Sequence, residues 1–141
     1  MIHQKNQGLS AVRNVGIEAA NGEYLTFIDG DDYVATIFLE HLVAALQDNI
    51  EIVVCGNKKM PAGEINSPAP QTISGEAATI ELLTRQENYH VISCGKLYRR
   101  TLFQNITFPL GRKNEDSFTT YKLFAQAKKI AFINEPLYFY V

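Results

Sequence analysis

A short apolar run that ends in three carboxylates constrains the fold more than any other part of this sequence. Residues 24–28 (Tyr-Leu-Thr-Phe-Ile) favour β structure and are mostly apolar, which is typical of a buried strand. The next four residues, 29–32, read Asp-Gly-Asp-Asp. Three carboxylates within four residues repel one another unless a cation binds there. Ligands of open α/β sheets bind beyond the carboxyl ends of the strands, so this turn is a candidate site for a divalent cation with oxygen ligands.

The segments around this turn alternate between helix and strand patterns. Leu39, Leu42 and Val43 recur at the spacing of a core-facing helix stripe, and the Asn-Gly pair at 21–22 is typical of a left-handed helix stop. Helices and strands in alternation indicate an α/β sheet covered by helices. The helices are predicted over residues 9–20, 36–47, 75–85 and 115–129, and the strands over residues 24–28, 50–54, 130–133 and 137–141.

The composition is that of one compact domain, residues 1–141, with a core of its own. Apolar residues make up 46% of the chain and charged residues 20%, which excludes disorder throughout. A chain of 141 residues is long enough to bury a core without a disulfide or a structural metal. Residues 56–74 are rich in proline, glycine and serine, and we expect an irregular surface excursion there.

Charge, hydropathy and cysteine usage exclude several classes of protein. A net charge of −2 excludes a nucleic-acid binder that works through a basic face. No apolar run reaches the ~18–20 residues of a membrane span, and the first residues lack the apolar core of a signal peptide. Cys55 and Cys94 form no Cys-x-x-Cys motif. Their pattern indicates a reducing compartment, so we expect a cytoplasmic protein.

Five short motifs occur in the order typical of one enzyme family. They are RN-x-G at 13–16, G-x-Y at 22–24, D-x-D-D at 29–32, KLYRR at 96–100 and ED at 115–116. Together they resemble the middle and later parts of a family 2 glycosyltransferase with the GT-A fold. The resemblance implies an α/β domain of the GT-A type, with a mixed sheet flanked by helices.

The acidic turn matches the metal-binding motif of that family. By this resemblance, Asp29 and Asp31 hold a divalent metal, Mn²⁺ or Mg²⁺, on the diphosphate of a nucleotide-sugar donor, and they contact its ribose. Such a metal would neutralise the charge that develops on the leaving group. Arg13 and Asn14 match a pair near the donor pocket of the family. The residues alone leave open the alternative that Arg13 is solvated on the helix surface.

The Glu-Asp pair matches the position of the family's general base. By this resemblance, Asp116 removes the proton from an acceptor hydroxyl as that hydroxyl attacks the anomeric carbon. A position at a helix start would keep the carboxylate ionised, as a base must be. Glu115 lies beside it and an exchange of roles between the two stays open. From local sequence alone, both carboxylates would only complement the helix dipole.

The function that the resemblance implies is metal-dependent, inverting transfer of a sugar in the synthesis of cell-surface polysaccharides or other glycans. Its partners would be a nucleotide-sugar donor and a saccharide or lipid-linked acceptor, with no nucleic acid and no transmembrane segment. A lipid-linked acceptor would bring the protein to the inner face of the membrane as a peripheral protein.

The chain also departs from the family at its start. The family's opening strand, helix and second strand have no counterpart before residue 6. We therefore expect a GT-A domain whose N-terminal part is missing, with an unpaired sheet edge that favours self-association. Two alternatives stay open: a non-catalytic remnant or interaction module of this fold, and a haloacid-dehalogenase-type phosphatase with Asp29 as nucleophile. The phosphatase pattern fits less well, because it has threonine or valine where Tyr33 stands.

Overall fold

The computed structural model describes residues 1–47, 49–61, 63–84 and 91–141. The helices are α1 (Leu9–Ala19), α2 (Phe38–Ala44), α3 (Gly75–Thr84) and α4 (Thr120–Gln126), with 3₁₀ turns η1 (Arg100–Phe103) and η2 (Glu115–Phe118). The strands are β1 (Tyr24–Thr26), β2 (Tyr33–Val34), β3 (Ile52–Lys59), β4 (Ile65–Asn66), β5 (Gln71–Ser74), β6 (Lys96–Arg99) and β7 (Lys129–Tyr140). The predicted end of the third helix, residue 85, lies outside the described residues.

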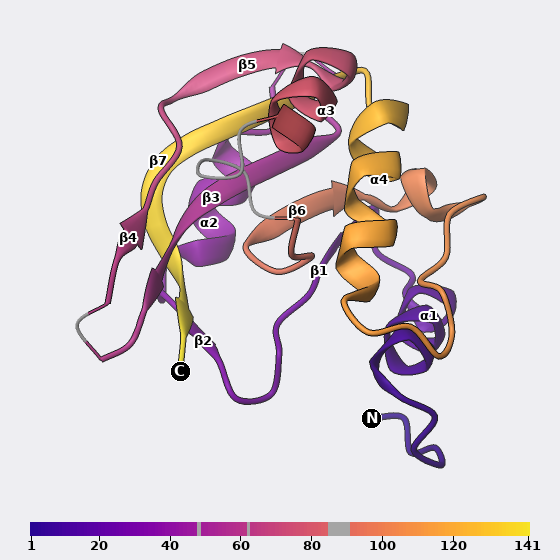
Figure 1. Cartoon of the computed structure of the whole chain (residues 1–141). Helices are drawn as coiled ribbons and strands as arrows, with labels where there is room; N and C mark the ends of the chain where they lie inside the picture. The colour runs from indigo at the N-terminus through magenta and orange to yellow at the C-terminus, as the bar shows by residue number, and fades with distance from the viewer. Residues whose placement is uncertain (48, 62, 85–90) are drawn as a thin grey trace.

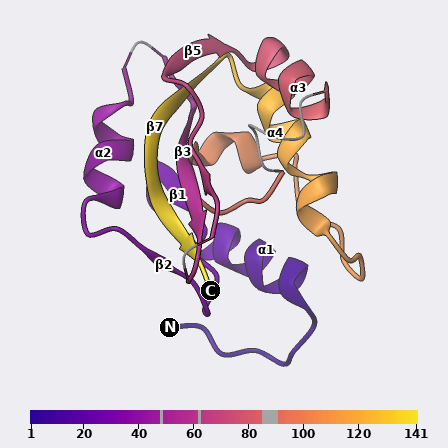
Figure 2. The same ribbon diagram turned by 60° about the vertical axis from the view of Figure 1, so that its left-hand side comes forward.

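The strands form one curled, mixed sheet with helices on both faces (Figure 1). Their order is β1-β6-β3-β7-β2, with β4 paired to β3 and β5 paired to β7. The central strands β3 and β7 run parallel, and the other pairs are antiparallel. Figure 2 shows the sheet closer to edge-on, with α2 on one side and α1, α3 and α4 on the other. The predicted mixed α/β sheet flanked by helices is therefore confirmed.

The central strand β3 is buried on both of its faces. Ile52 and Val54 belong to the core cluster that includes residues of α3 and α4, and Val53 and Cys55 belong to the cluster that includes residues of α2. Burying an aliphatic side chain of this size contributes roughly 1.5–3 kcal/mol. A strand without a solvent face needs apolar residues at successive positions, which explains the continuous apolar run in this part of the sequence.

The last strand is longer than predicted. The sequence predicts two closing strands with a turn at 134–136, but β7 is unbroken because its second half continues to pair with β3. The pairing register shifts around Gly56, where an added Cβ would lie 2.5 Å from Ser67 Oγ. Residues 56–74, predicted to be irregular, thus contain the end of β3 together with β4 and β5.

Helix α2 buries Leu42 of the predicted stripe but not the other two residues named for it. Phe38 and Leu42 are 1% and 0% exposed, whereas Leu39 and Val43 are 54% and 55% exposed. The two buried residues and the two exposed residues are each four apart, so they form neighbouring stripes of one helix. Spacing alone identified the correct period, but the rotation of the helix about its axis is set by its contact with the sheet.

Two helix boundaries also differ from the predictions. α1 ends at Ala19 and is followed by Ala20 in extended conformation, with no left-handed residue at 21–22. The helix predicted over 115–129 is divided into η2 and α4, and Lys129 belongs to β7. η2 follows Asn114, whose φ of 56° is left-handed. The Glu-Asp pair therefore lies on a separate 3₁₀ turn, which changes the direction of its side chains.

Candidate functional site

The acidic turn after β1 is held from behind by the end of the chain. The amide of Asp32 donates to the carbonyl of Asp29 at 3.1 Å, which closes the turn. The Asp32 carboxylate accepts from the Tyr138 hydroxyl at 2.7 Å and from the Val141 amide at 3.1 Å. The same hydroxyl accepts from the Asp29 amide at 3.2 Å. Asp32 and Tyr138 thus fix the shape of the turn, a role that the sequence analysis did not assign to them.

The two predicted metal ligands differ in their surroundings. The side chain of Asp29 is 35% exposed and its Oδ1 lies 3.1 Å from Nη2 of Arg13. Asp31 is exposed to solvent. Within the described ranges there is no group of three or more histidine, cysteine or acidic residues arranged to hold a metal ion. Mg²⁺ often takes only one or two carboxylates and completes its shell with water and substrate phosphates. Asp29 and Asp31 fit a metal shared in that way, not a cage made by protein alone.

Arg13 lies at the centre of the candidate site, with 5% of its surface exposed. Its Nη1 lies 2.6 Å from Glu115 Oε1 and 2.5 Å from Asp116 Oδ1, and its Nη2 contacts Asp29. Burial alone would lower the pKa of Arg13, but Asp116 and Asp29 raise it above its ordinary value. The alternative of a solvated Arg13 is therefore wrong: its side chain is buried among three carboxylates.

One face of α1 brings Arg13 to this position. Ser10 lies three residues before Arg13 and four before Asn14, so both are its neighbours on the helix surface. The Ser10 hydroxyl donates to the Pro109 carbonyl at 2.7 Å. The Asn14 amide donates to the carbonyl of Phe108 at 2.9 Å and accepts from its amide at 2.8 Å. Asn14 thus anchors the segment that leads to the Glu-Asp pair.

Aromatic rings shield the guanidinium from water. The Cζ atom of Arg13 lies 5.2 Å from the ring centroid of Phe108 and 5.9 Å from that of Phe27. A cation close to such rings is attracted to their electron-rich faces. The neighbouring rings also lower the local polarity, so the ion pairs of Arg13 are screened less than pairs on the surface.

Asp116 receives two donors on the same oxygen. Its Oδ1 accepts from Arg13 and from the hydroxyl of Ser93, both at 2.5 Å. The side chains of Glu115 and Asp116 are 10% and 15% exposed, so the second is the more accessible of the pair. Sequence reasoning missed Ser93, because it lies in a stretch without a clear helix or strand pattern and outside the five motifs.

The structure brings together residues from three distant parts of the chain. Asp29, Glu115 and Asp116 meet around Arg13, whereas Asp31 points to solvent from the same turn as Asp29. A cavity of about 430 Å³ opens between α1 and β1, and Arg13, Asp29 and Gly30 contribute to its lining. This cavity offers space for a ligand directly beside Asp29 of the acidic turn.

The basic residues of the KLYRR motif do not gather into one patch. Lys96 is 2% exposed and points into the protein. Arg99 lies 3.1 Å from Glu23, and Arg100 donates to the carbonyl of Gly22 at 2.7 Å. The two arginines therefore hold the turn between α1 and β1 through Glu23 and Gly22.

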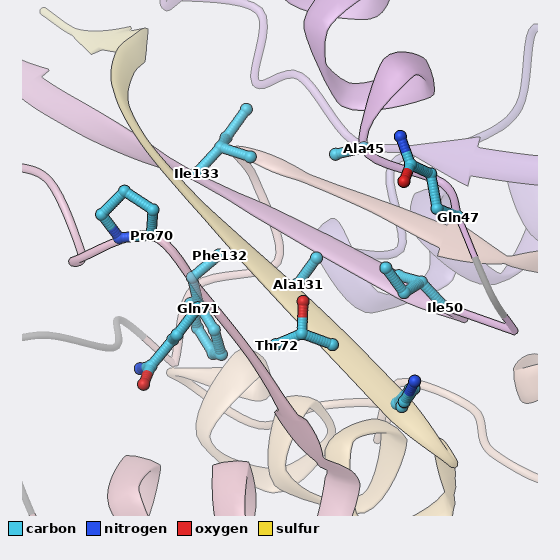
Figure 3. Close-up of a pocket in the computed structure, with 10 residues that line it drawn as sticks. Ala45, Gln47, Ile50, Pro70, Gln71, Thr72, Ala131, Phe132 and Ile133 are labelled. Carbon is cyan, nitrogen blue, oxygen red and sulfur yellow. The ribbon is translucent and has the colours of Figure 1, made fainter.

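A second cavity, of about 500 Å³, lies on the α2 side of the sheet (Figure 3). As Figure 3 shows, its walls come from β5, β7 and the chain after α2. The part of its lining that the structure describes contains no carboxylate, so it offers none of the acid–base chemistry of the first cavity. The lining residues are Ala45, Gln47, Ile50, Pro70, Gln71, Thr72, Lys129, Ala131, Phe132 and Ile133.

Comparisons with known proteins point to one family. The family model described as "Glycosyl transferase family 2" matches residues 1–107. The chain is 36% identical to the uncharacterized glycosyltransferase EpsJ of Bacillus subtilis, an alignment that covers 99% of this chain and 44% of EpsJ. It is 31% identical to glycosyltransferase GlyG of Streptococcus pneumoniae, over 99% of this chain and 51% of GlyG. The chain spans about half the length of these curated relatives.

The fold is similar to that of a solved glycosyltransferase. The crystal structure of Staphylococcus aureus TarS in complex with UDP-GlcNAc superposes with a TM-score of 0.79 and 22% identity, over 98% of this chain and 40% of that chain. The likeness shows the GT-A architecture that the motifs imply. In the described segments, every helix is too short or too polar to cross a membrane.

Proposed function

This chain belongs to glycosyl transferase family 2, and from that membership we propose that it moves a sugar from a nucleotide-sugar donor to a saccharide or lipid-linked acceptor by one inverting displacement. The observation that carries the proposal is the buried guanidinium of Arg13, which joins Asp29 of the acidic turn to Asp116. A nucleotide-sugar donor held at Asp29 and an acceptor activated by Asp116 would therefore lie next to each other. The phosphatase alternative is dropped, because the family match includes the acidic turn on which it depended.

The donor side of the proposal depends on the acidic turn and the cavity beside it. TarS, which has the same fold, was crystallised with UDP-GlcNAc, and this supports a nucleotide-sugar as the donor here. Asp29 and Asp31 would hold Mn²⁺ or Mg²⁺ there, although Asp29 also contacts Arg13 through its Oδ1 atom. When bound there, the metal would neutralise charge on the leaving nucleoside diphosphate. The phosphates would supply the ligands that these two carboxylates lack.

The acceptor side of the proposal depends on Asp116. Its Oδ1 is occupied by two donors, and no hydrogen bond to Oδ2 is found in the described part of the chain. In the proposed reaction, Oδ2 takes the proton of an acceptor hydroxyl, whose oxygen bonds to the anomeric carbon. The bond from that carbon to the diphosphate oxygen breaks, and its electron pair leaves with the nucleoside diphosphate. Glu115 is less exposed, so we assign the base to Asp116 and not to its neighbour.

The acceptor class is proposed from the relatives. The chain is 30% identical over 131 residues to poly(ribitol-phosphate) β-N-acetylglucosaminyltransferase TarS of S. aureus, a match that covers 91% of this chain and 22% of TarS. The acceptor named for that relative, a poly(ribitol-phosphate), supports a glycan or a related polymer as the acceptor here.

Calorimetric titration of the full chain with Mn²⁺ and UDP tests the donor side. We expect Asp31→Asn to abolish Mn²⁺-dependent binding of UDP, because one of two protein ligands is lost. Glu76→Gln, at an acidic residue in the first turn of α3, is the matched control and should bind as the original chain does. Unchanged binding by the Asp31 variant would remove this residue from the site.

Transfer assays with the same variants test the acceptor side. Asp116→Asn should keep Mn²⁺-dependent binding of UDP and lose sugar transfer, because the amide cannot take up the proton. Full turnover by that variant would refute the assignment of the base. Binding of UDP by the original chain with no transfer to any acceptor would instead support the non-catalytic alternative.

A further inference from the structure

The hydroxyl that reaches Asp116 comes from a turn that β6 holds in place. Ser93 is 0% exposed and donates to Oδ1 of Asp116 at 2.5 Å. Charge-assisted O–H···O⁻ bonds are typically 2.5–2.7 Å long and about twice as strong as neutral ones. The mechanism proposed above uses Asp116 as the base and assigns no role to the buried serine that donates to it.

Three successive carbonyls of this turn accept from two side chains of β6. Nζ of Lys96 donates to the carbonyl of Ile92 at 2.6 Å and to that of Cys94 at 3.4 Å. The hydroxyl of Tyr98 donates to the carbonyl of Ser93 at 3.1 Å. Burial raises the pKa of Tyr98 well above its ordinary value, so this hydroxyl stays protonated and remains a donor.

The backbone allows Lys96 to reach back over the turn. Gly95 has a φ of 68°, a left-handed conformation that glycine adopts without strain. This residue reverses the chain immediately before β6, so the side chain of Lys96 faces the carbonyls that precede it. Lys96 is 2% exposed, and no carboxylate lies within 4 Å of it in the described ranges. A buried ammonium is costly unless it is hydrogen-bonded, which is why its contacts with these carbonyls matter.

We propose that Ser93 is a positioning residue for Asp116, held by Lys96 and Tyr98, and that it directs Oδ2 of Asp116 toward the acceptor. The inference rests on the proposed function of Asp116 as the base. Arg13 and Ser93 together occupy Oδ1, so the carboxylate cannot rotate without breaking two charge-assisted hydrogen bonds. Oδ2 is thereby the oxygen available for the acceptor proton, in a fixed direction.

NMR spectroscopy of the full chain tests the positioning directly. A hydroxyl proton in a buried, charge-assisted hydrogen bond exchanges slowly with water, so the Ser93 hydroxyl should give an observable resonance. Lys96→Met leaves Ser93 and Asp116 intact but removes the donor to two carbonyls, and it should speed this exchange at least tenfold. Tyr98→Phe removes only the donor to the Ser93 carbonyl and should also speed the exchange. It takes the place of Lys96→Met if that variant fails to fold. Thr79→Val, within α3, removes a hydroxyl that donates to Gly75 and should leave the resonance unchanged.

Two NMR results would overturn the proposal. One is the absence of a protected Ser93 hydroxyl in the original chain, and the other is unchanged exchange in both β6 variants. In transfer assays, Ser93→Ala should lower kcat about tenfold with the donor KM unchanged, and Ser93→Thr should restore most of the loss. A kcat unaffected by Ser93→Ala would also overturn the role. If the exchange of the Ser93 hydroxyl behaves as expected but Asp116→Asn retains full transfer, Asp116 is not the base. The positioning of its carboxylate by Ser93 would still stand.

Discussion

Removal of Arg13 should reverse the effect that Asp116→Asn has on stability. In the original chain, Asp116 accepts charge-assisted hydrogen bonds from Arg13 and Ser93. Loss of its charge should therefore cost about 1.5–3 kcal/mol of the free energy of unfolding. In an Arg13→Met background the same substitution removes one of three neighbouring negative charges that no longer have a cation between them. In that background, Asp116→Asn should leave the free energy of unfolding unchanged or increase it.

The magnitude follows from the burial of the cluster. Arg13 is 5% exposed and has three carboxylate partners, and removal of one member of a buried ion pair typically costs 3–5 kcal/mol. Arg13→Met alone should therefore fall in that range. The coupling energy between the two substitutions should be at least about 1.5 kcal/mol, because Asp116→Asn lowers stability in the original chain but not in the Arg13→Met background.

Urea unfolding at pH 7, followed by circular dichroism, measures this cycle. The exposed pair Arg99 and Glu23 is the control, since its side chains are 32% and 67% exposed. The cycle of Arg99→Met and Glu23→Gln should give a coupling below about 1 kcal/mol. An equal cost of Asp116→Asn with and without Arg13 would show that the guanidinium does not organise the carboxylates, and the reasoning about the site would be refuted.

Two further predictions concern groups around the site. Burial lowers the pKa of Lys96 from 10.5 to about 8, so between these values the unfolded chain keeps a proton that the folded chain has released, and stability should rise with pH. Measured by urea unfolding, the gain of the original chain relative to Lys96→Met should be about 1 kcal/mol between pH 8 and 9. Cys55 and Cys94 oppose the gain in both chains, because burial raises the pKa of each thiol to about 11, so the comparison with Lys96→Met removes their effect. Tyr138→Phe should cost about 1.5–3 kcal/mol, because it removes the hydroxyl that donates to Asp32, and a cost within 0.5 kcal/mol of zero would show that the acidic turn holds its shape without this bond.

Most of the fold was predictable because its signals are local. The apolar run at 24–28, the acidic turn and the alternation of helix and strand patterns identified an α/β sheet, and five ordered motifs identified the family. Errors arose where distant contacts decide the outcome. β7 is one strand and not two because β3 continues beside it, and α2 buries Phe38 because the sheet sets the rotation of that helix.

The sequence by itself determined the family and the α/β class, and it predicted which carboxylates a sugar transfer would use. Only the tertiary structure decided that Arg13 is buried among them, because its bond to Asp116 joins residues 103 positions apart. The role of Ser93 depends on tertiary structure in the same way, since β6 holds the turn from which its hydroxyl reaches Asp116. The physical reason is that hydrophobic period and turn chemistry act over a few residues, whereas the environment of a buried charge is made by segments that meet only after the chain has folded.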